Sequence, residues 1–183
     1  MIAAQTVMEA CRNAGYLWYT GVPCSFFAPL LDVILNQSDL QYMGATSEGE
    51  ALAISAGVTL GGFKSMTLCQ NSGFGNLVNP LTSLSHPFRI PSLLIVTWRG
   101  QPGTGDAPQH DLMGRNLHRL LDALETPWMM FPESEQELVK TIESAGVFMT
   151  ERGVPVVLIM KRGCVAPVPP PPTESPGKNR DAL

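Results

Sequence analysis

The stretch Ser65-Met66-Thr67-Leu68-Cys69-Gln70, followed by Asn71-Ser72-Gly73-Phe74-Gly75, contains the unit that decides the fold. The first six residues form a short β-rich apolar run and predict a buried strand. The next five are typical of a turn, and a segment of helix length follows them. Five further apolar runs recur along the chain with similar spacing. The six predicted strands are Tyr16–Thr20, Gln41–Ala45, Ser65–Gln70, Pro91–Thr97, Trp128–Phe131 and Pro155–Met160.

Segments of helix length separate these runs, and one more precedes the first run. The segment that begins at Ser134 has the clearest start signal, because Glu137 three residues later completes a capping-box pattern. Regular alternation of strands and helices predicts an α/β fold, in which a six-stranded parallel sheet is covered by helices on both faces. The predicted helices are Ala3–Asn13, Phe26–Asn36, Gly49–Gly62, Gly75–Ser85, Asp111–Glu125 and Ser134–Arg152.

The composition of the chain excludes several classes of protein. Its 183 residues are 44% hydrophobic, which is enough for one sizeable core. Twelve basic and sixteen acidic residues give a net charge of −4 with no basic run, so we expect no nucleic-acid ligand. The longest nearly unbroken apolar run, residues 154–160, is far shorter than the ~20 residues that span a bilayer, so we expect no membrane segment.

The N-terminus and the cysteines indicate the compartment. The first five residues lack the basic and apolar regions of a secretory signal, which predicts a cytoplasmic location. The four cysteines are widely spaced without a C-x-x-C pair, which is typical of isolated reduced thiols rather than of disulfides or a zinc site. We therefore expect no metal ligands in this chain.

The alternating pattern stops at Cys164. Residues 165–183 contain six of the sixteen prolines and almost no apolar side chains. We therefore predict one domain, residues 1–164, and a disordered proline-rich tail, residues 165–183. Polyproline segments bind SH3-like partners in some proteins, but a tether without a recognition role is the simpler interpretation.

Four polar loops follow the predicted strands, at residues 21–25, 46–48, 71–75 and 99–110. Because ligands of parallel sheets bind beyond the carboxyl ends of the strands, we expect these loops to open on one edge. Glu48 would lie in the mouth of the sheet. Glu50, by contrast, fits a solvated acid at a helix start, where the helix dipole favours it.

A stripe of small residues follows Glu48, at positions 49, 53, 57 and 61. Glycines on one helix face lower helix propensity by about 1 kcal/mol each relative to alanine, which indicates close packing against another backbone. From the sequence alone, that backbone belongs equally well to the same chain or to a neighbouring one.

The last two loops carry most of the polar side chains. Gln70–Asn76 combines glycines with amides at a helix start, where an anion or a polar ring edge can bind, although ordinary turns share the pattern. Residues 99–110 are rich in glycine and proline and predict a long ordered loop or lid. A helix-start histidine such as His110 is often structural. A Cys–His hydrolase using Cys24 or Cys69 lacks its nucleophile motif, and no phosphate-loop motif is present.

Taken together, four ordered segments resemble the pyrimidine-binding domain of thiamine diphosphate decarboxylases, and within these the phosphonopyruvate and sulfopyruvate decarboxylase branch. The segments are GVPCS at 21–25, SEGEALAISAG at 47–57, QNSGFGNLVNPL at 70–81 and RGQPGTGDAPQH at 99–110. The resemblance runs from about residue 5 to residue 163. It implies a pyrimidine-type α/β fold, thiamine diphosphate as cofactor and a small 2-keto acid as substrate.

The resemblance also implies roles for single residues. Glu48 would contact N1′ of the cofactor's aminopyrimidine, and Ser25 and His110 would handle protons. Further cofactor contacts are expected from Pro23, Gln70, Asn71, Gly73 and Asn76, and substrate contacts from Arg99, Asp106 and Gln109. Arg115 is a second candidate for the substrate's strong acid group, because guanidinium geometry suits a phosphonate or sulfonate.

Two departures from the family pattern affect the prediction. Cys24 stands where some phosphonopyruvate enzymes have an aspartate, which leaves the substrate open. Nothing resembles the Gly-Asp-Gly segment and following Asn by which this family binds magnesium and the diphosphate. The resemblance therefore implies the split form, in which this chain is the α subunit and a β subunit holds the diphosphate and Mg²⁺, within a higher hetero-oligomer.

The implied reaction is the conversion of 3-phosphonopyruvate to phosphonoacetaldehyde and CO₂. Two alternatives stay open. One is a sulfopyruvate decarboxylase that gives sulfoacetaldehyde, and the other is a non-catalytic regulatory subunit of the same fold. The joint presence of Glu48, Gln70, Asn71, Asp106 and His110 argues against the regulatory subunit.

Overall fold

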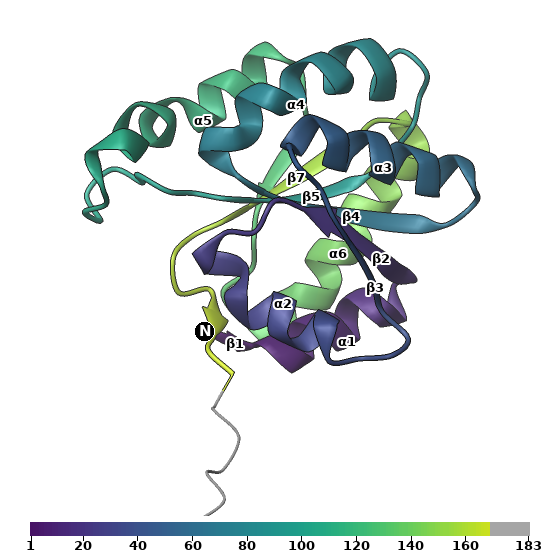
Figure 1. Ribbon diagram of the computed structural model, residues 1–183, viewed down its shortest axis with the longest axis horizontal. Helices are drawn as coiled ribbons and strands as arrows, with labels where there is room; N and C mark the ends of the chain where they lie inside the picture. Colours follow the sequence, from purple (N-terminus) through teal and green to yellow (C-terminus); the bar gives the residue numbers. More distant parts are fainter. Residues whose placement is uncertain (169–183) are drawn as a thin grey trace, which may run out of the picture.

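The computed structural model describes residues 1–168 and contains a central parallel sheet (Figure 1). Its strand order is β3-β2-β4-β5-β7-β6, and every pair is parallel. This confirms the expected six-stranded parallel sheet. The strands are β2 Tyr16–Gly21, β3 Gln41–Gly44, β4 Lys64–Gln70, β5 Leu93–Thr97, β6 Trp128–Met130 and β7 Val156–Met160.

Helices cover both faces of the sheet, as the alternation predicts. In Figure 1, α1, α2 and α6 lie below the sheet and α3, α4 and α5 lie above it. Neighbouring residues of β5 point to opposite faces, so that Leu93 and Ile95 enter one apolar core while Leu94 and Val96 enter the other. The helices are α1 Ala4–Asn13, α2 Ala28–Leu35, α3 Glu48–Leu60, α4 Phe74–Pro80, α5 Asp111–Ala123 and α6 Glu135–Arg152.

Of the helices described, none combines the length and the apolarity needed to cross a lipid bilayer.

The chain reverses its direction across the sheet at β2. It passes from β2 outward to β3 and then returns to β4 on the other side of β2. The helices that follow β2 and β4 therefore lie on opposite faces, α2 below the sheet and α4 above it (Figure 1). Open α/β sheets bind their ligands at such a reversal, beyond the carboxyl ends of the two strands.

The start of α3 is capped more fully than the sequence analysis anticipates. The Ser47 hydroxyl accepts a hydrogen bond from the backbone N–H of Glu50, and the Glu50 carboxylate accepts from the N–H and hydroxyl of Thr46. These bonds lower the pKa of Glu50. At the expected capping box of α6, Ser134 occupies the N-cap position but its side chain makes no capping hydrogen bond.

The predicted helix Gly75–Ser85 is interrupted. The α-helical part ends at Pro80, and Leu81–Ser85 form a π-helical turn in which the N–H of His86 bonds to the carbonyl of Leu81. Proline has no N–H to continue the α-helical ladder, which accounts for the change of pattern.

The stripe of small residues on α3 packs within the chain only at its start. A side chain at Gly49 would lie 2.8 Å from the carbonyl oxygen of Asn76, so α3 and α4 approach closely there. Ala53, Gly57 and Gly61 are exposed. Close packing against α4 of the same chain therefore explains the glycine at position 49, while the other three positions of the stripe are left exposed by residues 1–168.

The folded part extends beyond the expected boundary at Cys164. Val165–Ala166 form β8, which pairs in parallel with β1, Ile2–Ala3. Val165 and Ile2 are buried. Both strands have two residues, too few for a recognisable sequence pattern, so the prediction that the tail begins at residue 165 is wrong for these positions. The remainder of the predicted tail, residues 169–183, lies outside the described residues.

Candidate active site at the carboxyl edge of the sheet

Glu48 is the first residue of α3 and is 92% buried, since its exposed fraction is 8%. Its position at a helix start places a negative charge where the helix dipole favours it. One carboxylate oxygen, Oε2, accepts a hydrogen bond of 2.8 Å from Nδ2 of Asn76 on α4. The other oxygen, Oε1, has no hydrogen-bond donor among residues 1–168 and stays available to a ligand.

Gly73 provides the space that the Glu48 side chain occupies. A Cβ atom at position 73 would lie 2.8 Å from Cγ of Glu48 and closer still to its carboxylate. Real Cβ atoms do not approach other heavy atoms below about 3.0 Å, so any other residue here would displace Glu48. The expected turn glycine therefore acts by lacking a side chain, not by an unusual backbone angle.

Cys24 connects the ends of three strands. Its thiol donates to Oε1 of Gln70 over 3.2 Å and lies 3.7 Å from the hydroxyl of Thr97. These residues follow β2, end β4 and end β5, respectively. Gln70 in turn donates to the hydroxyl of Ser72. Thr97 was not singled out in the sequence, because a threonine within a buried strand carries no distinctive motif.

Asn71 joins two of the loops at this edge. Its side chain is fully buried. Nδ2 donates to the carbonyl of Arg99 over 2.7 Å, and Oδ1 accepts from the N–H of Arg99 over 3.2 Å. Through these two bonds Asn71 joins the loop after β4 to the loop after β5, and its expected contact with the cofactor stays a prediction.

Arg99 is paired with Asp106 inside the long loop. Its Nε and Nη2 atoms both lie 2.7 Å from the Asp106 carboxylate, and the guanidinium lies 4.9 Å from the ring centre of Phe26. Asp106 also accepts from the N–H groups of Gly100 and Ala107. The Arg99 bonds, supported by the two backbone N–H groups, hold the pKa of Asp106 well below its usual range. The guanidinium expected to bind substrate thus already carries a partner.

The same loop places His110 at the start of α5. Gly100 has φ +67°, and a side chain there would collide with the carbonyl of His110; one at Gly114 would collide with the carbonyl of Gly100. The loop therefore returns tightly onto the helix. The His110 side chain is 91% buried, with an exposed fraction of 9%, and its Nδ1 atom has no hydrogen-bond partner within the described residues. An unpaired buried nitrogen is costly and fits a group that meets a ligand.

The other predicted site residues lie at the surface. Pro23, Ser25 and Gln109 are exposed on the loops at this edge, and Arg115 is exposed on α5. Hydrogen bonds within residues 1–168 do not connect them to the Glu48 or Arg99 clusters. Their expected roles stay predictions, as do those of Gln70 and Gly73 toward the cofactor.

All four cysteines are free and buried. Burial raises the pKa of the Cys11 thiol to about 12. Burial also raises the pKa of Cys69 well above its usual value, and the neighbouring charges of Glu48 and Cys24 add to the effect. A thiol that stays protonated is a poor nucleophile, so the raised pKa of Cys69 argues against its use in a Cys–His hydrolase. Nowhere in residues 1–168 do three His, Cys, Asp or Glu side chains lie close enough to hold a metal ion.

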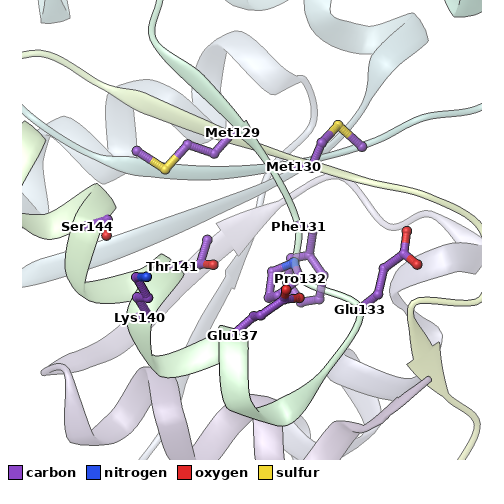
Figure 2. Close-up of a pocket in the computed structure, with 9 residues that line it drawn as sticks. All are labelled: Met129, Met130, Phe131, Pro132, Glu133, Glu137, Lys140, Thr141 and Ser144. Carbon is purple, nitrogen blue, oxygen red and sulfur yellow. The ribbon is translucent and has the colours of Figure 1, made fainter.

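A separate groove of about 560 Å³ lies between the edge strand β6 and α6 (Figure 2). Met129 and Met130 line it from the strand, and Lys140 and Thr141 line it from the helix. None of its lining residues belongs to the four loops. In the sheet, the two strands β5 and β7 lie between β6 and β4. The groove is therefore not part of the candidate site.

Comparison with known proteins identifies relatives of two lengths. The chain is 40% identical over 169 residues to a phosphonopyruvate decarboxylase of Streptomyces viridochromogenes, which covers 92% of this chain but only 43% of the relative. It is 35% identical to a sulfopyruvate decarboxylase subunit alpha of Methanocaldococcus jannaschii, covering 87% of this chain and 93% of the relative. The chain thus spans less than half of the first relative and nearly all of the second. No protein-family model matches it.

Among solved structures, the chain matches a thiamine diphosphate-dependent 4-hydroxybenzoylformate decarboxylase of Rhodococcus jostii. The TM-score is 0.67 at 20% identity, over 93% of this chain and 32% of that one. At this identity the likeness shows the fold, and it confirms the expected α/β type. Together with the sequence relatives, the fold shows that the chain belongs to the phosphonopyruvate and sulfopyruvate decarboxylase family.

Proposed function

We propose that the chain is the α subunit, or pyrimidine-binding half, of a thiamine diphosphate-dependent decarboxylase that converts 3-phosphonopyruvate to phosphonoacetaldehyde and CO₂ in the cytoplasm. The observation that carries the proposal is the buried Glu48 carboxylate at the carboxyl edge of the sheet. One of its oxygens is fixed by Asn76 and the other is unpaired. The 40% identity to a phosphonopyruvate decarboxylase supports the choice of substrate.

The residues present fit the pyrimidine end of the cofactor. A ring nitrogen needs a nearby carboxylate oxygen that is free to share a proton, and Oε1 of Glu48 is such an oxygen. The carboxyl ends of β4 and β2 add Gln70 and the exposed loop residue Pro23. When bound, thiamine diphosphate accepts the electron pair released as the C–C bond to the carboxylate breaks.

Each remaining residue then has a defined task. Glu48 holds and moves the proton at N1′ of the aminopyrimidine. His110, whose Nδ1 lacks a partner in the described chain, protonates the carbon that has lost CO₂, and Ser25 assists on the same side. Burial of both Glu48 and His110 excludes water, which strengthens their electrostatic effect.

The substrate's strong acid group would meet Arg99, with Asp106 and Gln109 beside it. The ion pair with Asp106 uses the Nε–H and one N–H of Nη2, so the second N–H of Nη2 and both of Nη1 are open to an added anion. A phosphonate or sulfonate therefore either binds through these N–H groups or replaces Asp106. Arg115 on the exposed surface of α5 is the second candidate for this contact.

A partner chain would complete the site by holding the diphosphate and Mg²⁺. Residues 51–88 contain Lys64 as their single Asp, Glu, Lys or Arg, although they include α3, α4 and much exposed surface. Leu60, Phe63 and Phe88 are 73%, 58% and 70% exposed on this stretch. Depletion of charge is typical of the centres of protein interfaces. We therefore propose that the β subunit docks on the outer face of α3, which begins at Glu48.

The decisive experiment mixes the pure chain with a candidate β chain that carries the Gly-Asp-Gly motif, with thiamine diphosphate and Mg²⁺. Aldehyde release from phosphonopyruvate is expected from the mixture but not from either chain alone. Faster turnover of sulfopyruvate would instead favour the sulfopyruvate alternative, which the near full-length match to an alpha subunit also supports. A stable complex inactive on both substrates would favour the non-catalytic subunit. Turnover by the chain alone would refute the split site.

A further inference from the structure

Asn76 makes a contact that the expected cofactor role does not explain. It lies in the third position of α4, and its side-chain Nδ2 donates to Oε2 of Glu48 at the start of α3. An ionised carboxylate only accepts hydrogen bonds, so the amide must turn its nitrogen toward Glu48. Within the described residues this is the single hydrogen bond to the Glu48 carboxylate, and it engages one oxygen only.

The surrounding backbone makes this contact specific. Gly49, next to Glu48, is so close to the backbone carbonyl of Asn76 that a side chain there would lie 2.8 Å from the oxygen. The start of α3 and the first turn of α4 are thus held at one fixed separation. Gly73 leaves the space on the other side of the carboxylate. The Glu48 carboxylate is therefore held on one side by the Asn76 amide of α4 and packs on the other side against Gly73, the N-cap of the same helix.

We propose that Asn76 is a positioning residue that orients the Glu48 carboxylate and need not touch the cofactor. The inference rests on the proposed function for its consequence in catalysis, but the contact itself concerns this chain alone. An amide serves this purpose well because it is neutral at every working pH. It fixes one oxygen without supplying a second titratable proton, and it leaves Oε1 to exchange the proton at N1′.

Asn79 offers a matched control on the same helix. It lies three residues after Asn76, is exposed, and its side chain makes no hydrogen bond within residues 1–168. Asn76→Ala in the complex with the β chain is expected to reduce kcat about 10- to 100-fold, because misplacement of a reacting group by about 1 Å has an effect of this size. The KM for substrate should change less than threefold. Asn79→Ala should leave both constants within about twofold of the parent chain.

Two further variants separate positioning from a structural role. Asn76→Asp places a second carboxylate against Glu48 and should reduce kcat more than Asn76→Ala does, because like charges repel. In a Glu48→Ala background, Asn76→Ala should cause no additional loss, since a residue that acts through Glu48 has nothing left to orient. A full additional loss in that background would overturn the proposal.

A measurement on the free chain keeps the test independent of activity. In the ¹⁵N-labelled chain, Glu48→Ala should move the side-chain amide resonances of Asn76 and leave those of Asn79 in place. If the resonances of Asn76 do not move, the contact is refuted whatever the activity. If the complex is active and Asn76→Ala behaves like Asn79→Ala, the positioning role is refuted while the proposed function stands. If the complex is inactive but the resonances move, the proposed function fails and the contact stands.

Discussion

Gly73→Ala should displace the Glu48 carboxylate and lower kcat strongly, while it lowers the free energy of unfolding only modestly. The backbone at Gly73 has φ −81° and ψ −9°, which alanine adopts without strain. The added Cβ would, however, lie 2.8 Å from Cγ of Glu48 and closer to the carboxylate. The obstructing atoms belong to the end of a flexible side chain, so the side chain moves and the backbone does not.

The structure sets the size of both effects. The carboxylate must retreat by about 1 Å or more to reach a normal contact, which costs about 10²-fold in rate, or about 2.7 kcal/mol of transition-state stabilisation. Loss of the Asn76–Glu48 hydrogen bond would cost about 1.5–3 kcal/mol of the free energy of unfolding, and the reduced entropy of the unfolded chain would return about 0.4–1 kcal/mol. Stability should therefore fall by about 0.5–2.6 kcal/mol while kcat falls about 100-fold.

Gly75→Ala is the matched control, because it adds the same methyl group two residues away. Nothing lies within 4 Å of a Cβ at Gly75, and its position in α4 favours alanine by about 1 kcal/mol. Urea unfolding of both variants measures stability, and steady-state decarboxylation by the complex with the β chain measures kcat. If Gly73→Ala keeps kcat within threefold of Gly75→Ala, Glu48 is not held where the reaction needs it, and the reasoning fails.

Three further predictions concern the same edge of the sheet. Glu48→Gln should leave unfolding and subunit assembly unchanged but remove most decarboxylation, because an amide cannot exchange the proton at N1′; activity within about threefold of the parent with cofactor bound would contradict this. Steady-state kinetics should show that His110→Ala lowers kcat more than it changes KM, and that Arg99→Ala chiefly raises KM; a change in KM alone for His110→Ala would make it a binding residue. The hydrogen bonds from Arg99 lower the pKa of Asp106 from its ordinary 3.8. The ion pair therefore contributes its full stabilisation of the fold above about pH 4, and this stabilisation is lost as the pH falls through the lowered pKa. Urea unfolding at pH 7, 4 and 2.5 should therefore show the parent losing more stability than Asp106→Asn at acid pH, and equal losses would refute the pair.

The central strands could be predicted because they are nearly continuous apolar runs buried on both faces, whereas the edge strands β3 and β6 are buried only in part. β5, for example, is fully buried over Leu93–Thr97 and sends alternate side chains into two cores. β1 and β8 could not be predicted, because each has two residues and exists only through pairing across 163 positions of sequence, from Ile2 to Val165. Such non-local pairs leave no local pattern.

The two helix starts show how an identical pattern produces different contacts. Ser47 and Glu50 have the same spacing as Ser134 and Glu137, and both serines have the extended backbone of an N-cap. The Ser47 hydroxyl nevertheless makes the capping bond and that of Ser134 does not. Neither the residue pattern nor the N-cap backbone distinguishes the two, so the sequence predicts where the helix begins but not which bonds hold it.

The candidate site shows the same division. The rule that parallel strands present their following loops at one edge correctly predicts that Glu48, Gln70, Asn71, Arg99 and His110 lie at the carboxyl edge of the sheet. It does not determine what each polar group bonds. Arg99 was expected to face substrate, yet its nearest anion is Asp106, seven residues later in the same loop. A long loop must satisfy its own buried polar groups before any remain for a ligand.

Asn71 makes the physical reason clear. The backbone ladder between β4 and β5 ends with the pair Gln70 and Thr97, because the chain then turns into the short helix Asn71–Gly73. Beyond this point the N–H and carbonyl of Arg99 face a strand that has left the sheet. The Asn71 side chain supplies the donor and the acceptor that the next residue of the strand would have supplied. An amide that replaces a rung of the ladder lets the chain turn away after Gln70, and that turn places Gly73 against the Glu48 side chain.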